Sequence, residues 1–127
     1  MIEAVLDASA LLALLNGEPG AEAVEPLLNR AAVSSVNLCE VASRLVDRGL
    51  DRDEVREVLG VVAVAAVHEF DRTAAELAAE LRRSVPYSLS LGDRACMALA
   101  QVLGVPAVTA DRGWMQVQAG VEVRLIR

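Results

Sequence analysis

The chain alternates short apolar runs with longer segments in which apolar residues recur every three or four positions. Short apolar runs bounded by turn residues are typical of buried strands, and the three-to-four spacing is typical of helices that bury one face. We predict strands at residues 2–6, 31–34, 61–67, 107–109 and 121–126. Helices are predicted at 8–15, 21–30 (bent near Pro26), 36–48, 51–59, 72–83 and 93–103, with a loop at 84–90 and a short turn around Trp114.

Several residues mark where these helices begin and end. Asp93 favours a helix start, because a negative side chain suits the positive end of the helix. Gly104 and Pro106 end the same helix, since glycine adopts the left-handed conformation readily and proline cannot continue the helical hydrogen bonding. Ser35 and Asp71 are predicted to cap the helices that follow them.

The regular alternation of strands and helices determines the predicted fold class. Short connections between alternating strands and helices are typical of an α/β domain with a mainly parallel sheet. We therefore predict a three-layer α/β/α architecture. With 127 residues the chain is long enough to bury a core of its own, and we expect one domain spanning residues 1–127.

The composition limits the classes of protein to which the chain can belong. The net charge is −6 and all 12 basic residues are arginine, so the broad basic surface of many nucleic-acid binders is absent. Hydrophobic residues make up 54% of the chain, and a partner or a second subunit would cover those that the core does not bury. Cys39 and Cys96 lie within helical patterns, and we expect both to be buried, unpaired residues of a cytoplasmic protein.

No stretch of the sequence has the length and hydrophobicity of a membrane span. The apolar run at 58–67 is far shorter than the roughly 20 residues that a bilayer requires. Residues 1–7 include two acids and no basic segment, which is not the pattern of a signal peptide. We therefore expect no association with a membrane.

Four of the 18 acidic residues stand in apolar surroundings or at the ends of predicted elements. Asp7 and Asp111 follow strands, whereas Glu40 and Asp93 lie near helix starts. In a parallel sheet, the carboxyl ends of strands and the amino ends of helices meet at one edge. We therefore expect the four carboxylates to share one crevice, although each of them alone is equally explained by a helix cap or an ion pair.

Four carboxylates in one crevice require a compensating positive charge. Two unit charges about 4 Å apart repel by about 4 kcal/mol at an effective dielectric near 20. Either some of the carboxyl groups hold protons or a cation lies among them. Oxygen ligands without histidine or cysteine favour Mg²⁺ or Mn²⁺, and such ions commonly act on phosphate esters. The sequence thus favours metal-dependent phosphodiester hydrolysis.

Four segments, at 5–13, 35–40, 91–96 and 108–114, together resemble PIN-domain ribonucleases of the VapC toxin type. They occur in the order found in that family and extend over nearly the whole chain. The resemblance implies a PIN-like fold and an endoribonuclease that acts as the toxin of a toxin–antitoxin pair. It also implies an RNA substrate, a cognate antitoxin protein and a homodimer.

The same resemblance implies roles for individual residues. A metal site for Mg²⁺ or Mn²⁺ would be formed by four acids, which are Asp7, Glu40, Asp93 and Asp111. Ser9 and Thr109 match hydroxyl positions that support this site. Arg94 and Arg112 can each reach a phosphate or pair with a neighbouring acid, and the sequence leaves both alternatives open.

A metal-independent ribonuclease and a non-catalytic module are two alternatives to this enzyme. A metal-independent ribonuclease needs a general acid and a general base, usually two histidines or a histidine with a lysine. The chain has one histidine, His68, and no lysine, which disfavours that mechanism. A PIN-like module that binds RNA or a partner without cleaving it remains open, because the sequence does not show whether the four acids reach one another.

Overall fold

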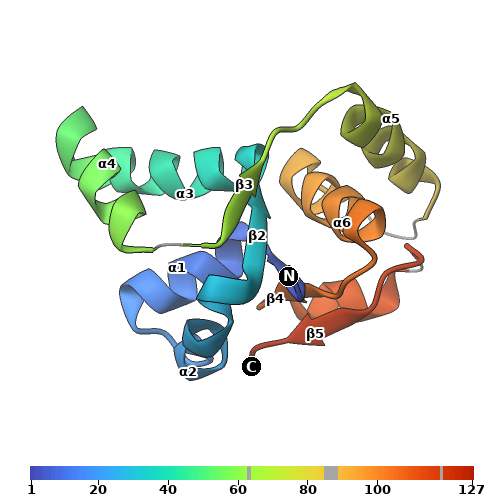
Figure 1. Cartoon of the computed structure of the whole chain (residues 1–127), viewed down its shortest axis with the longest axis horizontal. Coiled ribbons are helices and arrows are strands. Elements are labelled where there is room, and N and C mark those ends of the chain that lie inside the picture. The colour runs from blue at the N-terminus through green and yellow to red at the C-terminus, as the bar shows by residue number, and fades with distance from the viewer. Residues whose placement is uncertain (63, 85–88, 118) are drawn as a thin grey trace.

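The computed structural model describes residues 1–62, 64–84, 89–117 and 119–127. Five parallel strands form one sheet in the order β3-β2-β1-β4-β5. Helices cover both faces of this sheet (Figure 1). The prediction of a three-layer α/β/α domain with a mainly parallel sheet is therefore confirmed.

Short strands and longer helices alternate along the chain. The strands are β1 (Ala4–Leu6), β2 (Ala31–Ser34), β3 (Ala66–His68), β4 (Ala107–Thr109) and β5 (Val123–Leu125). The α-helices are α1 (Ala8–Asn16), α2 (Ala21–Val24), α3 (Ser35–Asp47), α4 (Arg52–Val61), α5 (Arg72–Glu80) and α6 (Leu91–Leu103). Shorter 3₁₀ helices are η1 (Glu25–Arg30), η2 (Leu81–Ser84) and η3 (Arg112–Gln116). Over the ranges that the structure describes, no helix is long and apolar enough to cross a bilayer.

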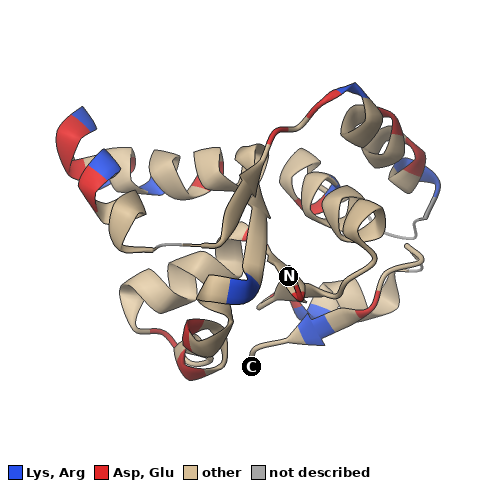
Figure 2. Ribbon diagram, in the orientation of Figure 1, with Lys and Arg blue, Asp and Glu red and all other residues tan. Residues whose placement is uncertain are grey.

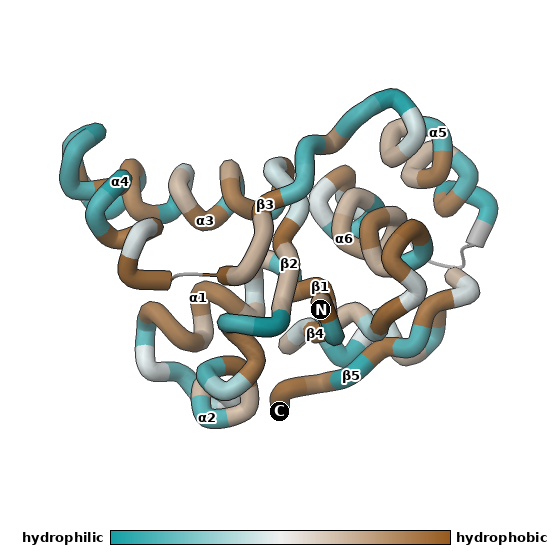
Figure 3. Tube along the Cα trace, viewed as in Figure 1, coloured by the Kyte–Doolittle hydropathy of each residue, from teal (hydrophilic) through white to brown (hydrophobic). Residues whose placement is uncertain are grey.

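The two faces of the sheet have separate apolar cores because successive side chains of a strand point to opposite sides. On one face, Val5 of β1 packs with α6, α5 and the indole of Trp114. On the other face, Leu6 and Val33 pack with α1 and with Val41 of α3. Figure 3 shows hydrophobic residues along the central strands and hydrophilic residues at the start of α4. The sheet is thereby held between two helical layers.

The candidate site residues lie where strands end and helices begin. Asp7 directly follows β1 and caps α1 by accepting a hydrogen bond from the N–H of Ala10. Asp111 comes two residues after β4, and its side chain accepts from the N–H of Gly113 at the start of η3. Because β1 and β4 are parallel neighbours, both acids are at the same edge of the sheet.

The prediction of an apolar strand over 61–67 was wrong in extent. Val61 is the last residue of α4 and is 76% exposed, and β3 begins only at Ala66. Residue 63 lies outside the described residues. A short apolar run lacks the periodicity that separates helix from strand, so the end of α4 could not be placed from it. In addition, β3 is at the edge of the sheet, where Val67 stays half exposed.

Other differences concern the ends of helices. Ser34, and not Ser35, caps α3 by accepting from the N–H of Val36, since Ser34 is the last extended residue of β2. Ser90 caps α6, so that Asp93 occupies the third helical position and accepts from the N–H of Ser90 in a capping box. The predicted helix at 72–83 divides into α5 and η2. Most of the expected loop at 84–90 lies outside the described residues.

The two cysteines have different environments, although both were predicted to be buried. Cys96 on α6 is fully buried, and burial raises the pKa of its thiol well above the ordinary value. Cys39 on α3 is exposed, because the buried positions of that helix are taken by Asn37, Val41 and Leu45. Both cysteines are free.

This difference predicts two rates of thiol modification. A soluble disulfide reagent should modify one thiol per native chain rapidly, because thiolate formation and access are both required for reaction. The second thiol should react only when the protein is unfolded with guanidinium. In Cys39→Ser the rapid phase should vanish, whereas two rapid thiols in the native wild-type protein would contradict the packing of α6.

Candidate active site

The four acids predicted from the sequence line a single cavity of about 200 Å³. Asp7, Glu40, Asp93 and Asp111 reach it from the end of β1, from α3, from α6 and from the end of β4, respectively. Its remaining lining residues are Ala8, Ser9, Leu12, Asn37 and Arg44. Segments separated by more than a hundred positions in the chain thus meet at the carboxyl edge of the sheet.

The acids differ in burial, which corrects the expectation that all four stand in apolar surroundings. Asp7 is 5% exposed, and Asp93 is half-buried. Glu40 and Asp111 line the same cavity but are exposed. One desolvated carboxylate therefore lies beside three that retain access to water.

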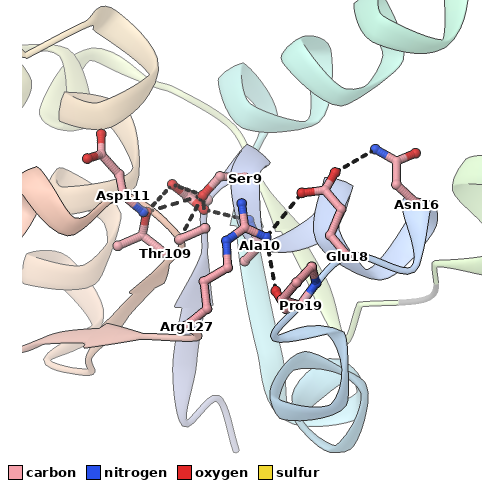
Figure 4. Close-up of polar contacts among 10 residues, drawn as sticks. Ser9, Ala10, Asn16, Glu18, Pro19, Thr109, Asp111 and Arg127 are labelled. Atoms are coloured by element: carbon pink, nitrogen blue, oxygen red, sulfur yellow. Dashed lines mark hydrogen bonds and ion pairs between the residues drawn. The ribbon is translucent and has the colours of Figure 1, made fainter.

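Two hydroxyl groups and one backbone N–H hold the buried carboxylate of Asp7. Thr109 donates to Oδ2 over 2.6 Å, Ser9 lies 2.7 Å from Oδ1, and the N–H of Ala10 donates to Oδ1 over 2.9 Å. The Ser9 hydroxyl also accepts from the N–H of Ala110, and the Thr109 hydroxyl accepts from the N–H of Asp111 (Figure 4). Three donors leave one of the roughly four lone-pair positions of a carboxylate for a ligand.

The other three acids each use one oxygen in a hydrogen bond. Glu40 Oε1 accepts from the side-chain amide of Asn37 over 2.9 Å. Asp93 Oδ2 accepts from the N–H of Ser90, and Asp111 Oδ1 accepts from the N–H of Gly113. Within the described ranges, the second oxygen of each has no such partner. These oxygens are available to a cation.

Gly92 provides the space in which the Glu40 side chain lies. A Cβ added at Gly92 would stand only 2.2 Å from Glu40 Oε1, far closer than any contact that real side chains make. Asn37 links the two residues, because its amide nitrogen donates both to Glu40 and to the carbonyl of Gly92. The glycine therefore leaves room for the carboxylate of α3 beside α6, and the asparagine links the two helices there. Both residues lie in segments that carry the family resemblance, but their roles were not predicted from the sequence.

Burial raises the pKa of Asp7 to about 6, well above the ordinary value of an aspartate. Hydrogen bonds from Thr109, Ala10 and Ser9 lower it in part, and the nearby negative charge of Asp93 raises it further. The charges of Asp7, Asp93 and Glu40 also raise the pKa of the Cys96 thiol beneath them, after the larger effect of burial. The site therefore has a negative potential that a cation would relieve.

The donor chemistry suits a hard divalent cation, since every candidate ligand is a carboxylate oxygen. In residues 1–62, 64–84, 89–117 and 119–127, however, no three histidine, cysteine, aspartate or glutamate side chains are arranged to hold an ion. Asp7 is fixed by its hydrogen bonds, whereas Glu40 and Asp111 are exposed and can change rotamer. Ligation of a metal would therefore require these exposed side chains to turn towards Asp7.

The arginines near the site have different environments. Arg94 donates to the backbone carbonyls of Leu89 and Ala78, so its guanidinium ties α6 to α5. Arg112 is exposed at the start of η3, and neither residue lines the acidic cavity. Arg44 does line it, although the sequence analysis did not single it out. Its position four residues after Glu40 on one helix was the available signal, because such residues share a helix face.

Comparison with known proteins places the chain in a family. The model of the PIN domain matches residues 4–120. Ribonuclease VapC42 of Mycobacterium tuberculosis is 34% identical over 118 residues, which cover 80% of this chain and 86% of that protein. The chain belongs to the VapC ribonuclease family. The sequence-based recognition of this family is thereby confirmed.

Solved structures agree with the VapC fold. A DNA-bound VapBC complex from Salmonella typhimurium matches with a TM-score of 0.78 and 18% identity, covering 100% of both chains. VapBC-5 of Mycobacterium tuberculosis, a member of the VapBC family of toxin–antitoxin systems, matches with a TM-score of 0.67 and 25% identity, covering 100% of this chain and 99% of that one. The VapC fold therefore extends over the full length of this chain.

The buried carboxyl of Asp7 predicts a pH dependence of stability in the absence of metal. An aspartate in an unfolded chain has a pKa of about 3.9, so the folded protein binds this proton more tightly than the unfolded chain does. The resulting stabilisation is complete below about pH 4 and is lost as the pH rises through about 6. In EDTA, the melting temperature of wild type minus that of Asp7→Asn should fall across this interval. A difference independent of pH would contradict the assignment.

The close approach of Gly92 and Glu40 predicts the effect of one added methyl group. Gly92→Ala should displace the Glu40 carboxylate and reduce RNA cleavage by about 100-fold, the loss expected when a catalytic group moves by about 1 Å. Gly60→Ala on α4 is the matched control, because a Cβ there meets nothing within 4 Å. Cleavage and melting should be measured for both variants. Full activity in folded Gly92→Ala would show that the position of Glu40 is unimportant.

Proposed function

We propose that this VapC-family protein is a metal-dependent endoribonuclease that acts as the toxin of a toxin–antitoxin pair. The observation that carries the proposal is the convergence of Asp7, Glu40, Asp93 and Asp111 on one cavity. The relatives named ribonucleases support RNA as the substrate. The proposed cofactor is Mg²⁺ or Mn²⁺, since both prefer oxygen ligands.

In this mechanism the chain supplies position and charge. A bound divalent ion would polarise the scissile phosphodiester and lower the pKa of the attacking water. Ser9 and Thr109 hold Asp7 in a single orientation, and the Ser90 N–H holds Asp93. Attack of water in line on phosphorus should leave a 5′-phosphate and a 3′-hydroxyl. A 2′,3′-cyclic phosphate would instead indicate attack by the ribose hydroxyl.

We also propose two protein partners, a cognate antitoxin and a second copy of this chain. The solved VapBC relatives, which are toxin–antitoxin complexes, support the antitoxin. Exposed apolar side chains support coverage by protein, and they include Val46 of α3 at 58% and Val61 of α4 at 76%. An antitoxin covering residues 36–59 could also place an arginine among the acids in place of the cation. The site of action would be the cytoplasm.

A second function, a PIN-like module that binds RNA or a partner without cleaving it, is favoured by one observation. The described carboxylates are not arranged to hold an ion. The free oxygens of Glu40, Asp93 and Asp111 argue for the enzyme, because a binding module has no need of unpaired acids around one cavity. An activity assay with a metal titration separates the two.

The substitution Asp93→Asn tests the proposed function. Asparagine can still accept from the Ser90 N–H, so the capping box should survive, but a neutral amide is a poorer ligand for a hard cation. We expect a folded protein, a loss of cleavage by orders of magnitude and a smaller rise in melting temperature on adding Mg²⁺. Glu54→Gln is the matched control, because Glu54 occupies the same third position of the capping box of α4, accepts from the N–H of Asp51, and does not line the acidic cavity.

The two variants give contrasting outcomes for the two functions. If Asp93 is a ligand, Glu54→Gln should cleave RNA like wild type while Asp93→Asn does not. Retained Mg²⁺-dependent cleavage by Asp93→Asn would remove this residue from the site. Absence of cleavage by wild type with either metal, over a range of RNAs, would favour the binding module.

A further inference from the structure

A second, larger hollow adjoins the acidic cavity along α3. Its volume is about 510 Å³, and it is lined by Ser35, Val36, Cys39, Glu40, Ser43, Arg44 and Asp47. Residues 35, 39, 43 and 47 recur every four positions, as do 36, 40 and 44, so the lining residues lie on one face of the helix. Glu40 and Arg44 line both spaces, which places them at the boundary between the hollow and the cavity.

Arg44 is the positively charged residue at that boundary. Its side chain is exposed, and in the part of the chain that the structure describes it forms no ion pair or hydrogen bond. Other arginines are engaged, such as Arg48 with Asn16 and Arg127 with Glu18. An unpaired guanidinium beside a negatively charged cavity can offer its planar set of donors to an anion.

The position of Arg44 indicates which phosphate of the RNA it would contact. The scissile phosphate must lie among the carboxylates, where a cation compensates their charge. Arg44 stands one helical turn from Glu40 and lines the α3 hollow as well as the acidic cavity, so the hollow gives its guanidinium access to a phosphate outside the carboxylates. We propose that Arg44 binds the RNA phosphate adjacent to the one cleaved and directs the strand along α3. This inference rests on the proposed function and names a positioning residue for it.

The alternative role for Arg44 is structural, namely to offset the repulsion among the acids. In that case its loss would destabilise the metal-free protein and would alter reactions at the acidic cavity regardless of the substrate. A contact with the adjacent phosphate makes a different prediction, since it acts only on substrates that possess a second phosphate. The salt dependence of binding also separates the roles, because each phosphate contact to a single strand contributes about 0.7 to the slope of log K against log salt.

The affinity of the protein for RNA is measured first. The probe is a short fluorescein-labelled single-stranded RNA, and its fluorescence anisotropy is recorded in Ca²⁺ over a range of salt concentrations. Arg44→Gln should raise Kd by about tenfold, which corresponds to loss of one charge-assisted contact, and should lower the salt slope by about 0.7. Arg44→Lys should recover part of the affinity, because the charge returns without the planar donors. Arg56→Gln on α4 is the matched control for the loss of one charge, since Arg56 is exposed and lines neither space. Figure 2 shows basic and acidic residues close together on α4.

Hydrolysis of bis(p-nitrophenyl) phosphate, which has a single phosphate, is measured second in Mn²⁺. Arg44→Gln should lose much more activity on RNA, through a rise in KM, than on this single-phosphate substrate. Equal losses on both substrates, equal weakening in Arg56→Gln, or RNA binding by Arg44→Gln like that of wild type would each overturn the proposal. Failure of wild type to cleave either substrate would refute the proposed function, whereas the binding comparison would still decide the role of Arg44.

Discussion

The burial of the Asp7 carboxyl group, with the negative charge of Asp93 nearby, is the constraint on which the rest of the site depends. Asp7 is held at the junction of β1 and α1, 5% exposed, with hydrogen bonds on both oxygens. Burial of a charged group without compensation is costly, and its pKa is accordingly raised to about 6. The fold thus positions a carboxyl group whose anion is only partly stabilised by hydrogen bonds and would be stabilised further by a nearby cation.

The residues around Asp7 hold its carboxyl group in place through hydrogen bonds and do not supply a positive charge to it. Ser9 and Thr109 bind Asp7, and their backbone contacts connect α1 with the end of β4. On the opposite wall, Gly92 and Asn37 allow α3 and α6 to approach so that Glu40 reaches the cavity. The result is a space lined by carboxylate oxygens. A divalent ion bound there would offset their negative charge and that of a phosphate.

Much of the fold was readable from the sequence because it follows from local patterns. Asp7 after an apolar run and Gly104 before Pro106 mark the ends of elements, and the structure has β1 and α6 ending there. The role of Gly92 was not readable, since it depends on a contact with Glu40, far away in the sequence. The exposure of Cys39 likewise depends on which face of α3 meets the core. The placement of the four acids around one cavity followed from topology, whereas their rotamers and hydrogen bonds could not follow from it.

The central claim is that the carboxylates around this cavity bind one or more divalent cations. Diffraction from crystals of the protein grown with Mn²⁺, recorded where manganese scatters anomalously, tests it most directly. The account predicts an anomalous peak in the cavity within about 2.0–2.3 Å of oxygens of Asp7 and Asp93, the range for hard cations bound by oxygen. RNA cleavage by the same preparation with no manganese bound to these acids would contradict it.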